Sequence, residues 1–140
     1  MSDSESIRRI IKSSNSHGVD ARSIDEIALE MAPQETPVEA FHFQDLWIGE
    51  NKLPGQFVAL ITSSRLLVAQ FVRGAFRATT TFHSFDLGNI REVSNVEKLK
   101  FSIAMADGTV LVFRGIGTFS KKYTASFQET LTRETDDSQH

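Results

Sequence analysis

The pattern of hydrophobic and polar positions is clearest in residues 57–72, FVALITSSRLLVAQFV. This segment is nearly all apolar, except for the Thr-Ser-Ser-Arg of residues 62–65 at its centre. A membrane span needs about 20 predominantly apolar residues, and a central arginine would cost about 2.5–3.5 kcal/mol on insertion scales. A single helix also fits poorly, because the apolar positions do not recur every three or four residues. We therefore predict a hairpin with strands at 57–61 and 66–72, whose turn serines bond their own backbone.

Five more segments have the composition or the alternation of strands. Residues 99–105, LKFSIAM, alternate apolar with polar or small residues. Asp107-Gly108 follows them and is a strong hairpin signal, so residues 109–114 are predicted as the returning strand. The remaining predicted strands are 38–48, 78–87 and 90–96, which gives seven strands in all.

Near the C-terminus the apolar period lengthens to four residues, which is typical of a helix. This period predicts an amphipathic helix over 118–133, with Thr118 or Ser120 as its N-cap. Residues 134–140 then contain three acids and no base, and we expect a disordered acidic tail there. The residues of the apolar stripe are Phe119, Tyr123, Phe127 and Leu131.

Residues 1–36 contain two short helical patterns, which together predict an N-terminal helical arm. The second begins with a capping box, SIDE, at residues 23–26. Short helices with narrow apolar stripes are not stable alone in water. We therefore expect the arm to pack on the strands or on another subunit. The stripe residues that we predict as interface residues are Ile7, Ile10, Ile11, Ile27 and Met31.

Composition and charge limit the classes of function. At 140 residues the chain suits one compact domain with extra segments at its ends. It has no cysteine, which excludes thiol catalysis and thiolate metal sites, and 11 phenylalanines, which indicate an aromatic core. Residues 37–133 contain eleven bases and eight acids, giving +3, which is too small for general nucleic-acid binding. No secretory signal is recognised at the N-terminus, so we expect a cytoplasmic protein.

Seven antiparallel strands followed by one C-terminal helix is the layout of the pleckstrin-homology-like (PH-like) barrel. Four segments also resemble the bacterial branch of this superfamily, and the resemblance covers about residues 38–133. It implies a mainly β (α+β) fold, in which a seven-stranded, partly open antiparallel barrel at 37–133 is capped by the C-terminal helix. The four segments are ALITSSRLLVA (59–69), FDLGNIREV (85–93), FSIAMADGTVLVFRG (101–115) and FQETL (127–131).

The resemblance implies a binding scaffold and not a catalyst. Ligands of such barrels usually meet the loops at the open rim or an exposed sheet edge, and bacterial members tend to form ring-like homo-oligomers. The branch that binds phosphoinositides has clustered bases around its first hairpin. Here the loop at residues 49–55 has one lysine beside one glutamate, which argues against inositide recognition.

Two similar segments, FHFQDL (41–46) and FHSFDL (82–87), each place a histidine and an aspartate three residues apart. Two such pairs suggest a metal site and, as the weakest alternative, a small metal-dependent hydrolase. However, positions three apart in a strand face opposite sides of the sheet. By the parity of the neighbouring apolar residues, His42 is expected to point outward and His83 inward, so the two histidines do not converge. We predict no metal, no cofactor and no enzyme activity.

Basic and aromatic residues supply the candidate binding sites. Arg73 and Arg77 flank Phe76 in a turn, an arrangement that can meet anions or a membrane interface. In the alternative interpretation, Phe76 tucks under its loop and both arginines are solvated. Trp47 is expected in the core, or else as an interface anchor, where tryptophan is enriched. A second basic patch or solvated face is expected from Lys98 and Lys100 with Lys121 and Lys122.

A partly open barrel has unpaired strand edges, which a neighbouring subunit or the N-terminal arm would cover. We therefore predict a non-catalytic module that self-associates into a homo-oligomer and binds a protein partner. The alternative is a peripheral membrane or anionic-ligand binder that uses the loop 73–77. No nucleic-acid partner is expected, and a membrane partner is not favoured.

Overall fold

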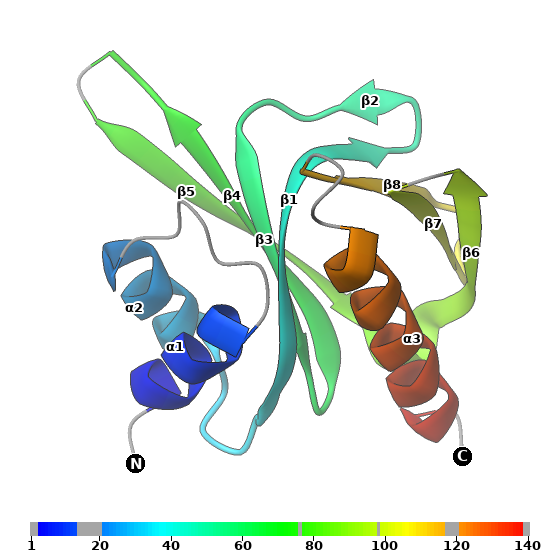
Figure 1. Ribbon diagram of the computed structural model, residues 1–140, viewed down its shortest axis with the longest axis horizontal. Coiled ribbons are helices and arrows are strands. Elements are labelled where there is room, and N and C mark those ends of the chain that lie inside the picture. The colour runs from blue at the N-terminus through cyan, green and yellow to red at the C-terminus, as the bar shows by residue number, and fades with distance from the viewer. Residues whose placement is uncertain (1–2, 14–20, 76, 98, 117–120, 139–140) are drawn as a thin grey trace.

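The computed structural model describes residues 3–13, 21–75, 77–97, 99–116 and 121–138 (Figure 1). No helix within these ranges is long and apolar enough to cross a membrane. The elements in chain order are α1 (Asp3–Ser13), α2 (Ala21–Glu30), β1 (Pro37–Ile48), β2 (Asn51–Lys52), β3 (Gln56–Thr62), β4 (Arg65–Arg73), β5 (Ala78–Asp86), the 3-10 turn η1 (Leu87–Asn89), β6 (Ile90–Glu97), β7 (Lys100–Met105), β8 (Val110–Gly115) and α3 (Lys121–Ser138).

The strands form one antiparallel sheet in the order β5-β4-β3-β1-β8-β7-β6, with β2 paired to the end of β1. β1 is central, because its first half pairs with β3 and its second half with β8. The register with β8 shifts between Phe43 and Asp45, and a bulge of this kind bends a strand. β1 therefore passes from one half of the sheet into the other (Figure 1). β5 and β6 end the order, so the barrel is not closed.

The predicted fold of seven antiparallel strands, a C-terminal helix and short N-terminal helices is confirmed. The hairpin predicted from residues 57–72 corresponds to β3 and β4. Its turn is held by Thr62, whose hydroxyl oxygen accepts from the backbone N–H groups of Ser64 (3.2 Å) and Arg65 (3.1 Å). The turn serines, expected in this role, instead bond Thr36 and Glu35. β2, which is only two residues long, is not among the predicted strands.

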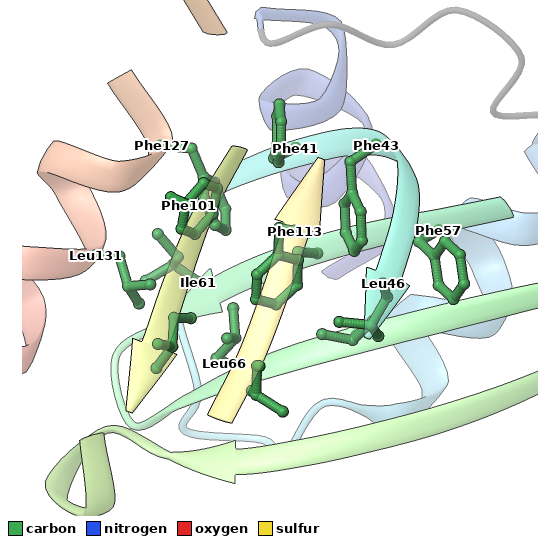
Figure 2. Packing of buried hydrophobic residues seen from close by; sticks show 14 of the residues in the cluster. Phe41, Phe43, Leu46, Phe57, Ile61, Leu66, Phe101, Phe113, Phe127 and Leu131 are labelled. Atoms are coloured by element: carbon green, nitrogen blue, oxygen red, sulfur yellow. The ribbon is translucent and has the colours of Figure 1, made fainter. Parts of the chain in front are cut away.

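Aromatic and aliphatic side chains fill the concave side of the sheet (Figure 2). The rings of Phe43 and Phe57 are stacked with centroids 5.2 Å apart. α3 closes this core with Phe127 and Leu131, and the ring of Phe127 lies 5.2 Å from that of Phe41. Such aromatic pairs contribute about 0.5–1.5 kcal/mol each beyond the area they bury. The many phenylalanines therefore account for much of this core.

α1 and α2 cover the opposite face of β1, β3 and β4 (Figure 1). Ile7 and Ile27 of these helices belong to one buried cluster with Val58 and Leu60 of β3. Both faces of β3 and of the first part of β4 are therefore buried. This explains the unbroken apolar runs there, because a strand buried on both faces does not need alternating polar residues.

α3 extends to Ser138, five residues beyond its predicted end. The stripe with a period of four continues from Phe127 through Leu131 to Thr135, which is 6% exposed. Residues 134–138 therefore belong to the helix and not to the predicted disordered tail. The predicted N-caps, Thr118 and Ser120, lie outside the described residues.

Candidate binding surfaces

A groove lies between β6 and α3, at one end of the sheet order. Its two parts have volumes of about 380 Å³ and about 580 Å³, and both are lined by Asn95, Ala125 and Gln128. Because the two parts share these residues, they form one continuous depression. Its volume lies in the range of ligand sites, but the part along α3 is open to solvent.

The charged side chains differ between the two parts of this groove. The part beside the β6–β7 turn is lined by Glu97 and Lys100, whose carboxylate and ammonium groups lie 3.8 Å apart. The part along the second half of α3 has three acids and one base, giving a net charge of −2. These residues are Glu129, Arg133, Asp136 and Asp137.

β6 ends the hydrogen-bonded order, so one of its edges has no neighbouring strand among the described residues. The strand bulges at both ends, where Arg91 and Val96 are the extra residues opposite β7. Bulges and charges on an edge reduce unspecific pairing with other chains. The regular part, residues 92–95, stays available, and Val96 beside it is 53% exposed.

Trp47 lies on the outer face of the sheet, and three cations surround its ring. The centroid is 4.8 Å from Lys100 Nζ, 5.8 Å from Lys52 Nζ and 5.7 Å from Arg114 Cζ. Contacts of this kind contribute about 0.5–1 kcal/mol at exposed sites. Trp47 is half-buried and belongs to neither core cluster, so the core position expected for it is wrong.

Asp45 is the buried acid beside these cations, and its side chain is 7% exposed. Arg114 donates to it from Nε (2.6 Å) and from a terminal nitrogen, while Lys52 Nζ lies 3.3 Å from Oδ1. The Asp45 carboxylate therefore pairs with both Arg114 and Lys52, and the three groups together have a net charge of +1. Asp45, Lys52 and Arg114 are not among the binding residues predicted from the sequence, because no local pattern indicates a pair that is 69 residues apart.

The predicted site at Arg73 and Arg77 lies at the tip of the β4–β5 hairpin, which projects from the sheet (Figure 1). The Gly74 N–H donates to the Arg77 carbonyl (2.9 Å), and both arginines are exposed. Phe76 lies outside the described residues. A role of this tip in binding anions or membranes stays a prediction.

The second predicted basic group is only partly described. Lys100 contacts Trp47 and lines the groove together with Thr124, so the start of β7 lies near the first turns of α3. Lys122, in the first turn of α3, is exposed. Lys98 and the side chain of Lys121 lie outside the described residues.

The predicted interface residues of the N-terminal arm pack within this chain. Ile7, Ile27 and Met31 are 0%, 1% and 7% exposed, and Ile10 is partly buried against the same cluster. The side chain of Ile11 lies outside the described residues. Packing on the strands was one of the two arrangements expected. An interface between subunits at these residues stays a prediction.

Glu35 and Arg65 join the N-terminal arm to the β3–β4 turn. Arg65 donates to the Glu35 carboxylate from Nε (2.8 Å) and a terminal nitrogen (3.0 Å). The hydroxyls of Thr62 (2.5 Å) and Ser64 (3.1 Å) and the Ala32 N–H (3.0 Å) donate to the same group. Burial raises the pKa of Glu35, but hydrogen bonds from Arg65, Thr62 and Ala32 outweigh it and lower the pKa to about 2. The carboxylate is therefore ionised at neutral pH.

The two histidines lie on opposite faces of the sheet, as expected. His42 is opposite Val58, on the face that α1 and α2 cover, whereas His83 is opposite Val68 of the concave core. His83 Nε2 lies 2.9 Å from Gln70 Oε1, and burial lowers the pKa of His83. Within the described ranges, no three His, Asp or Glu side chains are grouped to hold a metal ion.

Solved structures with a similar fold include two of the linker-DH/PH domains of p115-RhoGEF. An N-terminally truncated form has a TM-score of 0.56 at 11% identity, and the other form has a TM-score of 0.53 at 12% identity. Each match covers 96% of this chain and 39% of the other, so this chain spans about two fifths of those structures.

The C-terminal domain of an unknown protein from Leishmania infantum is also similar. Its TM-score is 0.50 at 14% identity, over 86% of this chain and 98% of that chain. Comparisons with protein-family models and with curated proteins find no match. At these identities the similarity concerns the fold alone, and it supports the PH-like fold expected from the sequence.

Proposed function

We propose that this chain is a non-catalytic module that self-associates and binds an extended segment of a protein partner. The observation that carries the proposal is the edge of β6 that has no neighbouring strand in the described part of the chain and lies beside the groove of α3. A segment that adds to a free edge gains main-chain hydrogen bonds, and side-chain contacts beside the edge supply specificity. The PH-like fold supports a binding role. Membership of the bacterial PH-like branch stays a prediction from the sequence.

The contacts on the two sides of the groove suggest the chemistry of the partner. Residues 92–95 offer a short regular edge for main-chain pairing, and the exposed Val96 offers an apolar contact at its end. The acids along the second half of α3 favour a base in the bound segment. We therefore propose a short extended segment with at least one apolar residue and one lysine or arginine.

Four titratable groups of the described residues have a shifted pKa, and their contacts lie within the fold. Glu35 anchors the N-terminal arm, and Glu39 accepts hydrogen bonds from α3. His83 contacts Gln70, and Asp107 accepts a hydrogen bond in the β7–β8 turn. None of these four groups lines the groove, where a reaction on a bound ligand would need them.

Substituting Ala125 tests the groove directly. Peptides that bind the full chain are first selected from a random displayed library. Their affinity for the Ala125→Arg variant is expected to be at least about tenfold lower than for the unmodified chain. The exposed Ala125 lies on the groove wall, and arginine is a good helix former, so the variant fills the groove without breaking α3. Fluorescence polarisation of labelled peptides measures the effect.

Ala106→Arg is the matched control, since Ala106 is exposed in the β7–β8 turn outside the groove. Its peptide affinity is expected to equal that of the unmodified chain. N-methylation of alternate peptide amides is expected to weaken binding, because it removes donors that pair with β6. Peptides that bind Ala125→Arg as tightly as the unmodified chain would show that the groove is not the binding surface.

A further inference from the structure

The outer face of β6, β7, β8, β1 and β2 is only partly covered. Its side chains point away from the concave core and include Trp47, Ala104 and Val112, each half-buried, and Val110, which is 41% exposed. The outer face of β3 and β4, by contrast, is buried under α1 and α2. Among the described residues, therefore, helices cover the outer face of only one half of the sheet.

The centre of this outer face has the composition of an interface. An antiparallel sheet that faces water usually presents polar side chains. Here the register aligns Ser102, Val112 and Trp47 in one row across three strands, and Ala104 lies opposite Val110 in the next row. Tryptophan with small apolar neighbours and a charged surround is typical of the core of a protein–protein contact.

Charged residues of opposite sign lie at the two margins of this face. On the β6 margin, Glu92 is exposed and makes no described ion pair. On the β2 margin, Lys52 is 55% exposed and shares the Asp45 carboxylate with Arg114. These three groups together have a net positive charge. The signs balance among the charged residues that the register places on this face, because Lys52, Lys100 and Arg114 oppose three acids, whereas the exposed bulge residue Arg91 has no register partner. The three acids are Asp45, Glu92 and Glu97.

A face that has positive charge at one margin and negative charge at the other is complementary to the same face of a second copy. A two-fold axis parallel to the strands and above β8 places β6 of one copy over β2 of the other. Ser94 shares the row of Lys52, so Glu92 of each copy then lies two residues, about 7 Å, along the strand from Lys52 of its neighbour. The two long side chains can span this offset, and the contact occurs twice because a two-fold interface is isologous. An axis perpendicular to the strands would instead place β6 on β6 and oppose like charges.

We propose that this face binds a second copy of the chain, as a face-to-face dimer with the two-fold axis parallel to its strands. The proposal rests on the self-association proposed above and specifies its surface. Four strands spaced about 4.8 Å apart, each contributing about five residues, and the two-residue β2 give a flat area of about 350 Å² per copy. This is below the roughly 800 Å² per partner of a stable interface, so the dimer is weak and forms at high concentration.

The test is a charge exchange between the two margins in the full chain. Light scattering and sedimentation from about 10 to 500 µM at low salt give the dimer dissociation constant. Glu92→Lys and Lys52→Glu are each expected to raise that constant at least about tenfold, since like charges then face each other. The double variant is expected to restore it to within about threefold of the original value, which a variant that fails to fold cannot do.

The only tryptophan of the chain supplies an independent readout, because Trp47 lies in this face. Its fluorescence emission is expected to shift to shorter wavelength as the concentration rises, and the shift is expected to follow the same dissociation constant. Glu129→Lys is the control, since it reverses an exposed charge in the partner groove and outside this face. It is expected to leave dimerisation unchanged.

The possible failures are distinguishable. A chain that stays monomeric at 500 µM would overturn both this dimer and the proposed self-association. A dimer that neither single variant weakens, or that the double variant does not restore, would overturn this face alone. Peptide binding in the β6–α3 groove would stand in both cases, because the Ala125→Arg experiment measures it separately.

Discussion

Glu35 and Glu39 lie four residues apart, yet their surroundings shift the pKa in opposite directions. Burial raises the pKa of both carboxyl groups. At Glu35, charged and neutral donors outweigh burial, and each pKa unit corresponds to about 1.4 kcal/mol. At Glu39, burial prevails over the hydroxyl donors Thr130 (2.9 Å) and Ser126 (3.3 Å). The pKa shifts differ because Glu35 accepts from the charged Arg65, whereas the described donors to Glu39 are neutral hydroxyls.

Glu35→Gln is expected to lower the free energy of unfolding at pH 7 by about 3 kcal/mol. It leaves the guanidinium of Arg65, whose side chain is 20% exposed, without its carboxylate. Breaking such a pair from one side costs about 3–5 kcal/mol when it is fully buried. Urea unfolding measures the change. Glu50→Gln, in the exposed turn before β2, is the control and is expected to stay within about 0.5 kcal/mol.

The same substitution also changes the pH dependence of stability. The pKa of Glu35 falls from 4.5 to about 2 on folding, so its contribution is present above about pH 4.5 and is lost as the pH falls toward 2. Between pH 7 and pH 3 the unmodified chain is therefore expected to lose more stability than Glu35→Gln. Equal losses in the two proteins would contradict the assignment of an ionised Glu35.

Glu39→Gln is expected to leave stability at pH 7 unchanged or to raise it. Because the pKa of Glu39 is raised on folding, its charged form opposes folding, and stability from this group increases as the pH falls through the folded-state pKa. Glutamine removes the buried charge and keeps an oxygen for the Thr130 hydroxyl. The gain is expected to shrink as the pH is lowered. A loss at pH 7 of more than about 1 kcal/mol in urea unfolding would contradict this account.

At the scale of elements, the N-terminal arm is part of the fold. α1 and α2 bury one face of β3 and β4, and Arg65 donates to the carbonyl of Glu30 at the end of α2 (2.6 Å). That carbonyl belongs to the last turn of a helix, where no intrahelical donor is left. The same arginine therefore binds Glu35 and the end of α2, and it fixes the arm at its connection to β1.

Two alanine substitutions on α2 measure how much the arm contributes. Ile27→Ala is expected to lower the free energy of unfolding by about 2–4 kcal/mol, because Ile27 is 1% exposed between α2 and the sheet. Leu29→Ala, on the same helix at 86% exposure, is the matched control and is expected to change it by less than about 0.5 kcal/mol. Guanidinium unfolding of both variants provides the comparison. Equal effects would mean that the arm is not docked as described.

At the scale of the whole molecule, the strands and their order along the chain were predictable. Alternation marked β7, and the Asp107-Gly108 turn marked its hairpin with β8, since these signals depend only on neighbouring residues. The layout of seven strands and one helix then indicated the PH-like fold. The extent of α3 was missed, because threonine at position 135 continues the buried stripe without being apolar.

The candidate surfaces were less predictable, because they join residues that are far apart in sequence. Trp47 has aromatic and apolar neighbours and was expected inside, but the bend in β1 places it on the outer face. The cations around it come from β2, β7 and β8. The groove likewise joins Asn95 of β6 to Ala125 of α3. Only the pairing of the strands brings such residues together.

The central position of β1 also affects the folding of a newly made chain. The partners of its first half, in β3, follow within about 25 residues, whereas Arg114, the partner of Asp45, is 69 residues away. At about 5–20 residues per second, ribosomal synthesis separates Asp45 from Arg114 by about 3–14 s. Within this interval β1, β3, β4 and β5 are completed, but the edge of β1 that faces β8 has no partner. This edge is therefore where the nascent chain is most exposed to pairing with the wrong strand.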